Sequence, residues 1–339
     1  MSVDFTAIDF ETANGFRGSP CALGIVTVRG GVVAAESSTL IKPPAGARAF
    51  DRRNVRIHGI RPEDVRDAPG IAEALEMLAE QAGDDVLVAH NAAFDMGVMA
   101  AASEVAGVAV RPWDYACTVQ MSRASFAIVS HSLPFSAAAA GAPMTVHHDA
   151  LADARACAAI AAEVVRRTGE DTLRGGLGSI GVAVSRLSPP DPSGGLSRAT
   201  SEALAKLPAE GDWVDGVPAE AAAEEERLPV VVPSADADPS NPLYGQRVLF
   251  TGTLGLSRAE AWRRAAACGA RPVAVMDSAT TMLVAGNGLT PEALAAGEGR
   301  RTSALNTALK LRGRGFGIEI VTEGEFLQRT GGHWPDRAV

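Results

Sequence analysis

The stretch Ile8-Asp9-Phe10-Glu11-Thr12 places two carboxylates one residue apart at the end of an apolar run, Val3–Phe10, which is typical of a buried strand. Residues i and i+2 of a strand project from the same face, so Asp9 and Glu11 should point together. Two like charges held this close repel, and they are costly to desolvate. A divalent cation between them would offset that cost, because hard cations prefer oxygen ligands. An edge strand whose acids face water is the alternative for this stretch alone.

Length and composition indicate a soluble globular protein. The 339 residues are enough for two domains, and 47% of them are hydrophobic. The N-terminal residues show no signal-peptide pattern and no apolar run is long enough to span a bilayer, so we expect a cytoplasmic protein without membrane contact. The four cysteines form no CxxC pair, which favours reduced thiols over a zinc site.

Charge and composition divide the chain. The net charge is −9, which argues against a simple nucleic-acid coat protein; it splits into −5 for residues 1–168, −8 for 169–241 and +4 for 242–339. From Ser188 the Pro- and Gly-rich sequence cannot form a packed core. We therefore predict a first domain at residues 1–187, a flexible acidic linker at 188–241, a second domain at 242–331 and a tail at 332–339.

The first domain shows strands followed by helices mixed with a further strand, which predicts an α/β layer with a mixed sheet. The predicted strands are Val3–Phe10, Ala22–Val28, Val32–Leu40 and Val86–Ala89, and the predicted helices are Ile71–Ala82, Met96–Ala106 and Leu151–Arg167. A short helical pair is expected within Thr172–Leu187 and a brief helix at Ser201–Leu207. An Arg-rich loop surrounds Ile57-His58-Gly59-Ile60 and carries Arg48, Arg52, Arg53, Arg56 and Arg61.

Two further acids and a histidine accompany Asp9 and Glu11. Asp95 follows a predicted strand, Asp153 lies in the first turns of a predicted helix, and His148 precedes Asp153 by five residues. Asp95 could instead cap a helix, and a lone histidine is often structural. Four acids could bind two divalent ions, which at a separation of about 3.5–4 Å can activate a water and stabilise a leaving oxygen. A histidine is suited to accept that water's proton near neutral pH.

Three motifs in this order resemble the DEDDh (DnaQ-like) superfamily of 3′→5′ exonucleases, which includes the proofreading subunit of bacterial DNA polymerase III. Asp9–Thr12 matches D-x-E-T, His90–Asp95 matches H-N-x-x-F-D, and His148–Asp153 matches H-x4-D. Ile57–Ile60 matches the V/I-H-G-I found between the first two motifs.

The resemblance implies a ribonuclease H-like fold and a role for each matching residue. Asp9, Glu11, Asp95 and Asp153 would ligate two Mg²⁺ or Mn²⁺ ions, and His148 would be the general base. Thr12, His58 and Asn91 would contact the terminal nucleotide, and His147 would be a surface neighbour. The chain departs from the family at Ala13-Asn14 and at Cys117-Thr118, which bears on substrate preference rather than on the chemistry.

Three features of the C-terminal part are Phe250-Thr251-Gly252-Thr253-Leu254, a turn at Gly269 and Ile320-Val321-Thr322-Glu323. With the order of its elements, they resemble a BRCT domain. The predicted order is strand Arg247–Thr251, helix Arg258–Cys268, strands Arg271–Val275 and Thr281–Ala285, helix Leu305–Leu311, strand Ile318–Val321 and helix Glu323–Thr330. Phe326 stands where the family usually has tryptophan. The resemblance implies phosphate contacts from Thr251, Gly252 and Lys310.

The sequence therefore predicts a metal-dependent 3′→5′ exonuclease that removes nucleotides from nucleic-acid 3′ ends. The expected substrate is DNA, and the expected process is repair, end-processing or proofreading. The second domain would bind a DNA end or a protein partner. An exoribonuclease that trims RNA is one alternative, and a BRCT scaffold with an inactive exonuclease domain is another. Aromatic residues make up only 5% of the chain, so a base-stacking channel is not predicted.

Overall fold

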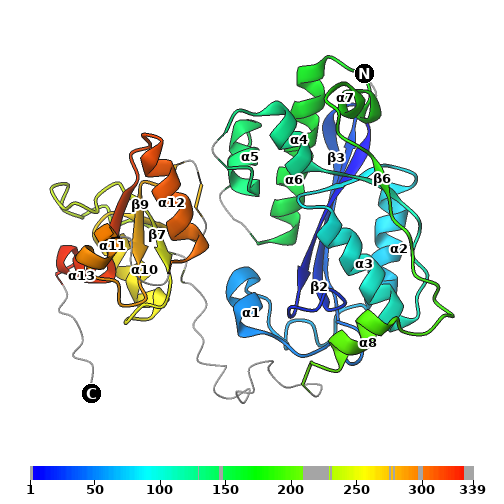
Figure 1. Ribbon diagram of the computed structural model, residues 1–339, viewed down its shortest axis with the longest axis horizontal. Coiled ribbons are helices and arrows are strands. Elements are labelled where there is room, and N and C mark those ends of the chain that lie inside the picture. The colour runs from blue at the N-terminus through cyan, green and yellow to red at the C-terminus, as the bar shows by residue number, and fades with distance from the viewer. Residues whose placement is uncertain are drawn as a thin grey trace. The chain divides into compact units, whose positions relative to one another are not determined.

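The computed structural model describes residues 3–128, 130–144, 148–208, 229, 231–274, 276–277, 279–296 and 301–331. The chain divides into two compact units, Met1–Glu225 and Glu226–Val339 (Figure 1). The predictions made for His147, Val275 and the 332–339 tail fall outside the described residues.

A six-stranded mixed sheet forms the centre of the first unit, which confirms the predicted α/β class. Its order is β3-β2-β1-β4-β5-β6. The strands are β1 (Phe5–Thr12), β2 (Pro20–Arg29), β3 (Val32–Leu40), β4 (Leu87–Ala89), β5 (Asp114–Cys117) and β6 (Ser185–Arg186). β1 pairs antiparallel with β2 and parallel with β4. β1 ends at Thr12, two residues beyond the predicted Phe10, so both Asp9 and Glu11 belong to the strand.

Helices cover both faces of this sheet (Figure 1). They are α1 (Arg52–His58), α2 (Ile71–Ala82), α3 (Ala93–Ala106), α4 (Thr118–Ser125), α5 (Leu133–Ala139), α6 (Ala150–Thr168), α7 (Leu173–Ser179) and α8 (Arg198–Leu204). Alternate residues of β1 enter different cores: Phe5 and Ala7 pack with α4–α7, whereas Ile8 and Phe10 pack with α2 and α3. This alternation puts Asp9 and Glu11 on the face that α6 covers.

The structure differs from the predicted elements where helices are short. The helical pair expected within Thr172–Leu187 is α7 followed by β6, which pairs antiparallel with β5. The Arg-rich segment contains α1, whose N-cap Asp51 accepts a hydrogen bond from the backbone N of Arg53 at 2.7 Å. One or two turns of helix are too short for an apolar stripe to appear in the sequence.

The described ends of the 188–241 segment are attached to their neighbouring units. The helix expected at Ser201–Leu207 is α8, which packs on α3, and Thr200 Oγ1 donates to Glu104 Oε2 at 2.5 Å. On the other side, the backbone N of Ser234 donates to the Ala266 carbonyl at 2.8 Å. Residues 188–208 therefore belong to the first unit rather than to a free linker.

The second unit has a four-stranded parallel sheet of order β10-β9-β7-β8. The strands are β7 (Arg247–Thr251), β8 (Arg271–Val273), β9 (Met282–Ala285) and β10 (Glu319–Thr322), with helices α10 (Arg258–Ala267), α11 (Pro291–Ala296), α12 (Ser303–Gly313) and α13 (Glu323–Arg329). The elements follow the predicted order, with α11 in addition. Phe326 is fully buried and its ring packs edge-to-face on Phe250 at 5.0 Å between centroids. In the described part of the chain, no helix combines the length and apolar character needed to cross a membrane.

Candidate active site

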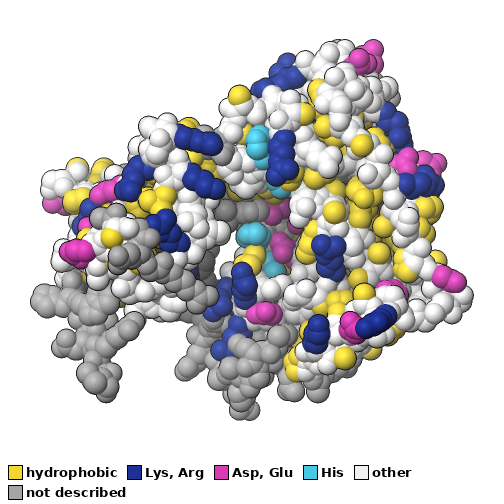
Figure 2. Space-filling model, viewed as in Figure 1, with side chains coloured by type: hydrophobic (Ala, Val, Ile, Leu, Met, Phe, Trp, Pro, Cys, Tyr) yellow, Lys and Arg dark blue, Asp and Glu magenta, His cyan; other side chains and the backbone are white. Residues whose placement is uncertain are grey.

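A cavity of about 490 Å³ opens in the first unit where β1 and β4 end. Figure 2 shows acidic and histidine side chains together in this hollow. Every first-domain site residue predicted from the sequence lines it: Asp9, Glu11, Thr12, His58, Asn91, Asp95, His148 and Asp153. The three motifs, which are far apart in sequence, therefore meet in one place.

The start of α6 reaches the site because a glycine lies beneath it. Gly24 of β2 is the register partner of Asp9, and a Cβ at Gly24 would lie 2.1 Å from the carbonyl oxygen of Ala150. No side chain fits there, so α6 rests directly on the strand next to β1. Asp149 caps α6 by accepting from the backbone N of Ala152 at 2.9 Å, which leaves Asp153 in the first turn beside the cavity.

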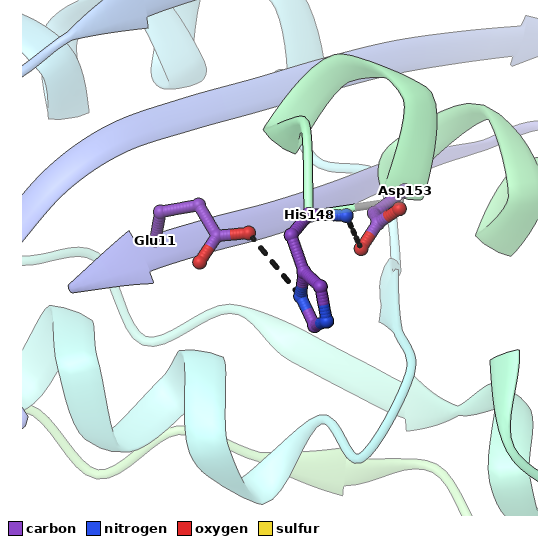
Figure 3. A group of neighbouring side chains, drawn as sticks. All are labelled: Glu11, His148 and Asp153. Atoms are coloured by element: carbon purple, nitrogen blue, oxygen red, sulfur yellow. Dashed lines mark hydrogen bonds and ion pairs between the residues drawn. The ribbon is translucent and has the colours of Figure 1, made fainter. Parts of the chain in front are cut away.

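Glu11, His148 and Asp153 lie close together in the site (Figure 3). One ligand atom from each lies within 4.8 Å of the others. His148 Nδ1 is 3.9 Å from Glu11 Oε1, and the backbone N of His148 donates to Asp153 Oδ2 at 3.2 Å. His148 has a left-handed backbone with φ of 63°, which is uncommon for a residue with a side chain. The ring is thus directed at Glu11, at a distance that suits either a general base or a metal ligand.

Asp9 on β1 and Asp95 on α3 complete the acidic set. Asp95 lies in the first turn of α3, is 1% exposed, and accepts from the backbone N of Phe10 at 3.0 Å. Burial raises the pKa of Asp95 to about 7 against the lowering effect of that N–H. Burial also raises the pKa of Asp9 well above its usual range, and the Asp95 and Asp153 carboxylates raise it further. For Glu11, burial and then Asp153 raise the pKa to about 8.

These shifts test whether the site suits a divalent cation. The raised pKa values of Asp9, Glu11 and Asp95 show that ionising these buried carboxyl groups is unfavourable, and bound cations would offset that cost. Carboxylate oxygens are the ligands that Mg²⁺ and Mn²⁺ prefer. The donor set of Asp9, Glu11, Asp95 and Asp153 therefore fits two such ions.

His58 supports the end of β1. Its Nδ1 accepts from the backbone N of Ile60 at 3.0 Å, so the proton lies on Nε2, which is 3.1 Å from the carbonyl oxygen of Thr12. Burial lowers the pKa of His58, which keeps the ring neutral. Asn54 Nδ2 donates to the same carbonyl at 2.8 Å. The contact of His58 with a nucleotide stays a prediction, whereas its hold on Thr12 is observed.

The first unit is similar in sequence to known proteins. Residues 6–161 match the exonuclease family model RNase_T. Over these residues the chain resembles that exonuclease family. It is 35% identical over 127 residues to a Mycobacterium tuberculosis protein (strain CDC 1551 / Oshkosh) whose name gives it a suspected bifunctional exonuclease/endonuclease activity. It is 30% identical over 161 residues to DNA polymerase III PolC-type of Thermotoga maritima.

The matches cover part of each protein. They span 35% and 46% of this chain, and 19% and 11% of those two relatives. A solved structure of Exonuclease X in complex with 5′ overhanging duplex DNA is 25% identical, with a TM-score of 0.39, over 49% of this chain and 93% of that one.

The first unit also contains a hydrogen-bond network beside the cavity that the sequence did not predict. The His90 ring contacts Thr118 Oγ1 at 2.9 Å and the His131 carbonyl oxygen at 3.0 Å. His131 Nδ1 in turn lies 2.8 Å from Ser122 Oγ. The network attaches the segment that carries Ser132, another cavity residue, to the ends of β4 and β5. Thr118, which directly follows the departure from the family at Cys117, is a buried part of this network.

The phosphate contacts proposed for Thr251, Gly252 and Lys310 of the second unit stay a prediction. Thr251 Oγ1 lies 2.7 Å from Thr302 Oγ1, at the N-cap of α12, while Lys310 is exposed in the last turn of that helix. The cationic side chain beside Gly252 is Arg258, which donates from Nη2 to its carbonyl oxygen at 3.0 Å.

Proposed function

We propose that this protein is a metal-dependent 3′→5′ exonuclease of the DEDDh type, acting on DNA 3′ ends. The observation that carries the proposal is the meeting of Asp9, Glu11, Asp95, Asp153 and His148 in one cavity at the end of β1. A domain of this type without catalytic activity would not need to keep all of these acids, whose burial is unfavourable.

The four carboxylates would hold two Mg²⁺ or Mn²⁺ ions. When bound, such ions supply a water of lowered pKa and stabilise the leaving oxygen. His148 is placed to accept the proton, because its ring is 33% exposed and can pass that proton to solvent. Thr12, His58 and Asn91 line the remaining wall and would receive the terminal nucleotide.

DNA is the proposed substrate because the Thermotoga maritima relative is a DNA polymerase. Repair or end-processing accounts for the second unit better than proofreading does, since a proofreading subunit has no need of it. We propose that residues 242–331 are a BRCT domain that binds a DNA end or a protein; its parallel sheet and the burial of Phe326 support this. The expected location is the cytoplasm.

The test is hydrolysis of end-labelled DNA and RNA, single- and double-stranded, with Mg²⁺ or Mn²⁺. We expect stepwise shortening of DNA from the 3′ end, abolished by Asp9→Ala. Faster shortening of RNA would favour the exoribonuclease. No hydrolysis of any substrate, together with binding by residues 242–331, would favour the scaffold. Equal rates for Asp9→Ala and wild type would overturn the two-metal assignment.

A further inference from the structure

The cavity is acidic, yet the proposed substrate is a polyanion. Among the described residues that line it, four are carboxylates and Arg17 is the one with a permanent positive charge. A nucleic-acid strand that approaches these carboxylates needs cationic groups along its path. Arg17 is exposed, which leaves it accessible from solvent.

Arg17 is held at the rim by α3. Its Nη1 donates to the carbonyl oxygen of Ala93 at 3.3 Å, and its guanidinium carbon lies 5.7 Å from the centre of the Phe94 ring. Both contacts are in the first turn of α3, beside Asp95. In the described residues this hydrogen bond uses one of the five N–H donors of the guanidinium.

The loop that carries Arg17 is fixed by Asn14, a residue noted in the sequence only as a departure from the family. Asn14 is 1% exposed, and its Nδ2 donates to the carbonyl oxygens of Ala47 at 3.2 Å and Ala49 at 2.6 Å. Its Oδ1 accepts from the backbone N of Phe16 at 2.9 Å. The loop therefore presents Arg17 in one place, at little entropic cost on binding.

Space for the guanidinium comes from Gly97 in α3. A Cβ at Gly97 would lie 2.5 Å from Arg17 Nη1 and 3.0 Å from Arg17 Cδ. Glycine in the middle of a helix is unfavourable, so its presence here is explained by the side chain that crosses it.

We propose that Arg17 binds a backbone phosphate of the substrate strand at the rim of the cavity, beside the nucleotide to be removed. The planar guanidinium can donate two N–H groups to one phosphate. This inference rests on the proposed function. The competing role is electrostatic only, since the charge of Arg17 also lowers the pKa of Asp95.

Arg17→Gln tests the proposal, with Arg111→Gln as the matched control. The guanidinium carbon of Arg111 lies 5.5 Å from the centre of the Trp113 ring, and Arg111 forms a salt bridge with Asp84. Arg111 precedes β5, which is parallel to β4, so it lies at the opposite end of the strands from the cavity. Affinity is measured by fluorescence anisotropy of a labelled ten-nucleotide dT strand, in the Asp9→Ala background to prevent hydrolysis. We expect Arg17→Gln to raise the Kd about 10-fold or more, as for a lost charged hydrogen bond. The slope of log Kd against log salt should fall by about 0.7. Arg111→Gln should change neither quantity.

Gly97→Ala provides a second test, because it displaces the guanidinium without removing it. We expect an unchanged or higher Tm and, with active enzyme, a KM raised as in Arg17→Gln at a nearly constant kcat. Gly178→Ala is the control, since a Cβ at Gly178 of α7 meets nothing within 4 Å.

The outcomes separate this inference from the proposed function. A wild-type protein that neither binds nor cleaves any nucleic acid overturns both. Cleavage by wild type with unchanged Kd, KM and salt slope in Arg17→Gln overturns the role of Arg17 alone. A lower kcat with unchanged Kd also overturns it, and assigns Arg17 to the electrostatics of Asp95.

Discussion

His148 is the residue whose role the geometry leaves between general base and ligand. We expect His148→Ala to slow hydrolysis about 10²–10⁴-fold, the usual loss for a general base. Metal affinity should change little, because the carboxylates provide the proposed ligands. Calorimetry of Mn²⁺ binding beside the kinetics checks this. A parallel loss of metal affinity would make His148 a ligand with Glu11 and Asp153, the group that its ring position also allows.

The acidic site predicts an unusual pH dependence of the metal-free protein. The pKa of Asp95 is about 7 and that of Glu11 about 8 in the folded state, against about 4 when unfolded. The folded state therefore binds more protons between these values, so stability should fall as pH rises from about 4 through 8. The measurement is Tm across this pH range in EDTA. Added Mg²⁺ should restore Tm at pH 8, because it binds the folded state.

Removal of one carboxylate should weaken this dependence. Asp9→Asn removes a buried carboxyl group that Asp95, Asp153 and Glu11 repel, so it should raise the metal-free Tm at pH 8 and change it little at pH 5. A lower Tm for Asp9→Asn at pH 8 would show that Asp9 makes a contact more valuable than the repulsion it causes.

At this scale the acids could be predicted because each lies in a motif beside a regular element. Arg17 and the His90–His131 contact could not. They depend on where a loop without hydrophobic periodicity folds against α3 and β4, and spacing carries no signal of that.

At the scale of elements, the site depends on how closely α6 approaches β2. Gly24→Ala would place a methyl group 2.1 Å from the Ala150 carbonyl oxygen, and backbone cannot yield there as a side-chain end can. We expect the free energy of unfolding to fall by about 1–3 kcal/mol or more. Activity should fall in folded protein as well, because α6 carries Asp153.

Denaturant unfolding and single-turnover rates check this prediction, again with Gly178→Ala as control. Full activity in folded Gly24→Ala would mean that the position of α6 tolerates a shift of that size.

The long strands and helices were predictable from their apolar periods, as α2, predicted and observed at Ile71–Ala82, shows. The short elements were not. β6 has two residues, and pairs with β5 through a return of the chain that no local pattern specifies.

At the scale of the whole molecule, the attachment of α8 sets where the first unit can be cut. Thr200 bonds Glu104 of α3, so a chain ending at Leu187 should lose stability that a chain ending at Pro208 keeps. Composition suggested a linker from Ser188, although a brief helix was expected at Ser201–Leu207, because composition carries no signal that this helix packs on α3. Comparison of Tm for residues 1–187 and 1–208 checks this, and equal values would show that α8 adds nothing.

The second unit should act on affinity rather than on chemistry. The proposed site lies wholly within the first unit, so residues 1–208 should turn over short single strands at the rate of the full chain. The +4 balance of residues 242–339 predicts attraction to a phosphate-rich partner, and tethering raises local concentration without adding contacts at the site. Truncation should therefore weaken apparent affinity for long duplexes, chiefly at low salt. A salt series on short and long substrates tests this for both chains. Equal affinity throughout would leave protein recruitment as the role of the second unit, and loss of turnover on short strands would show that the two units depend on each other.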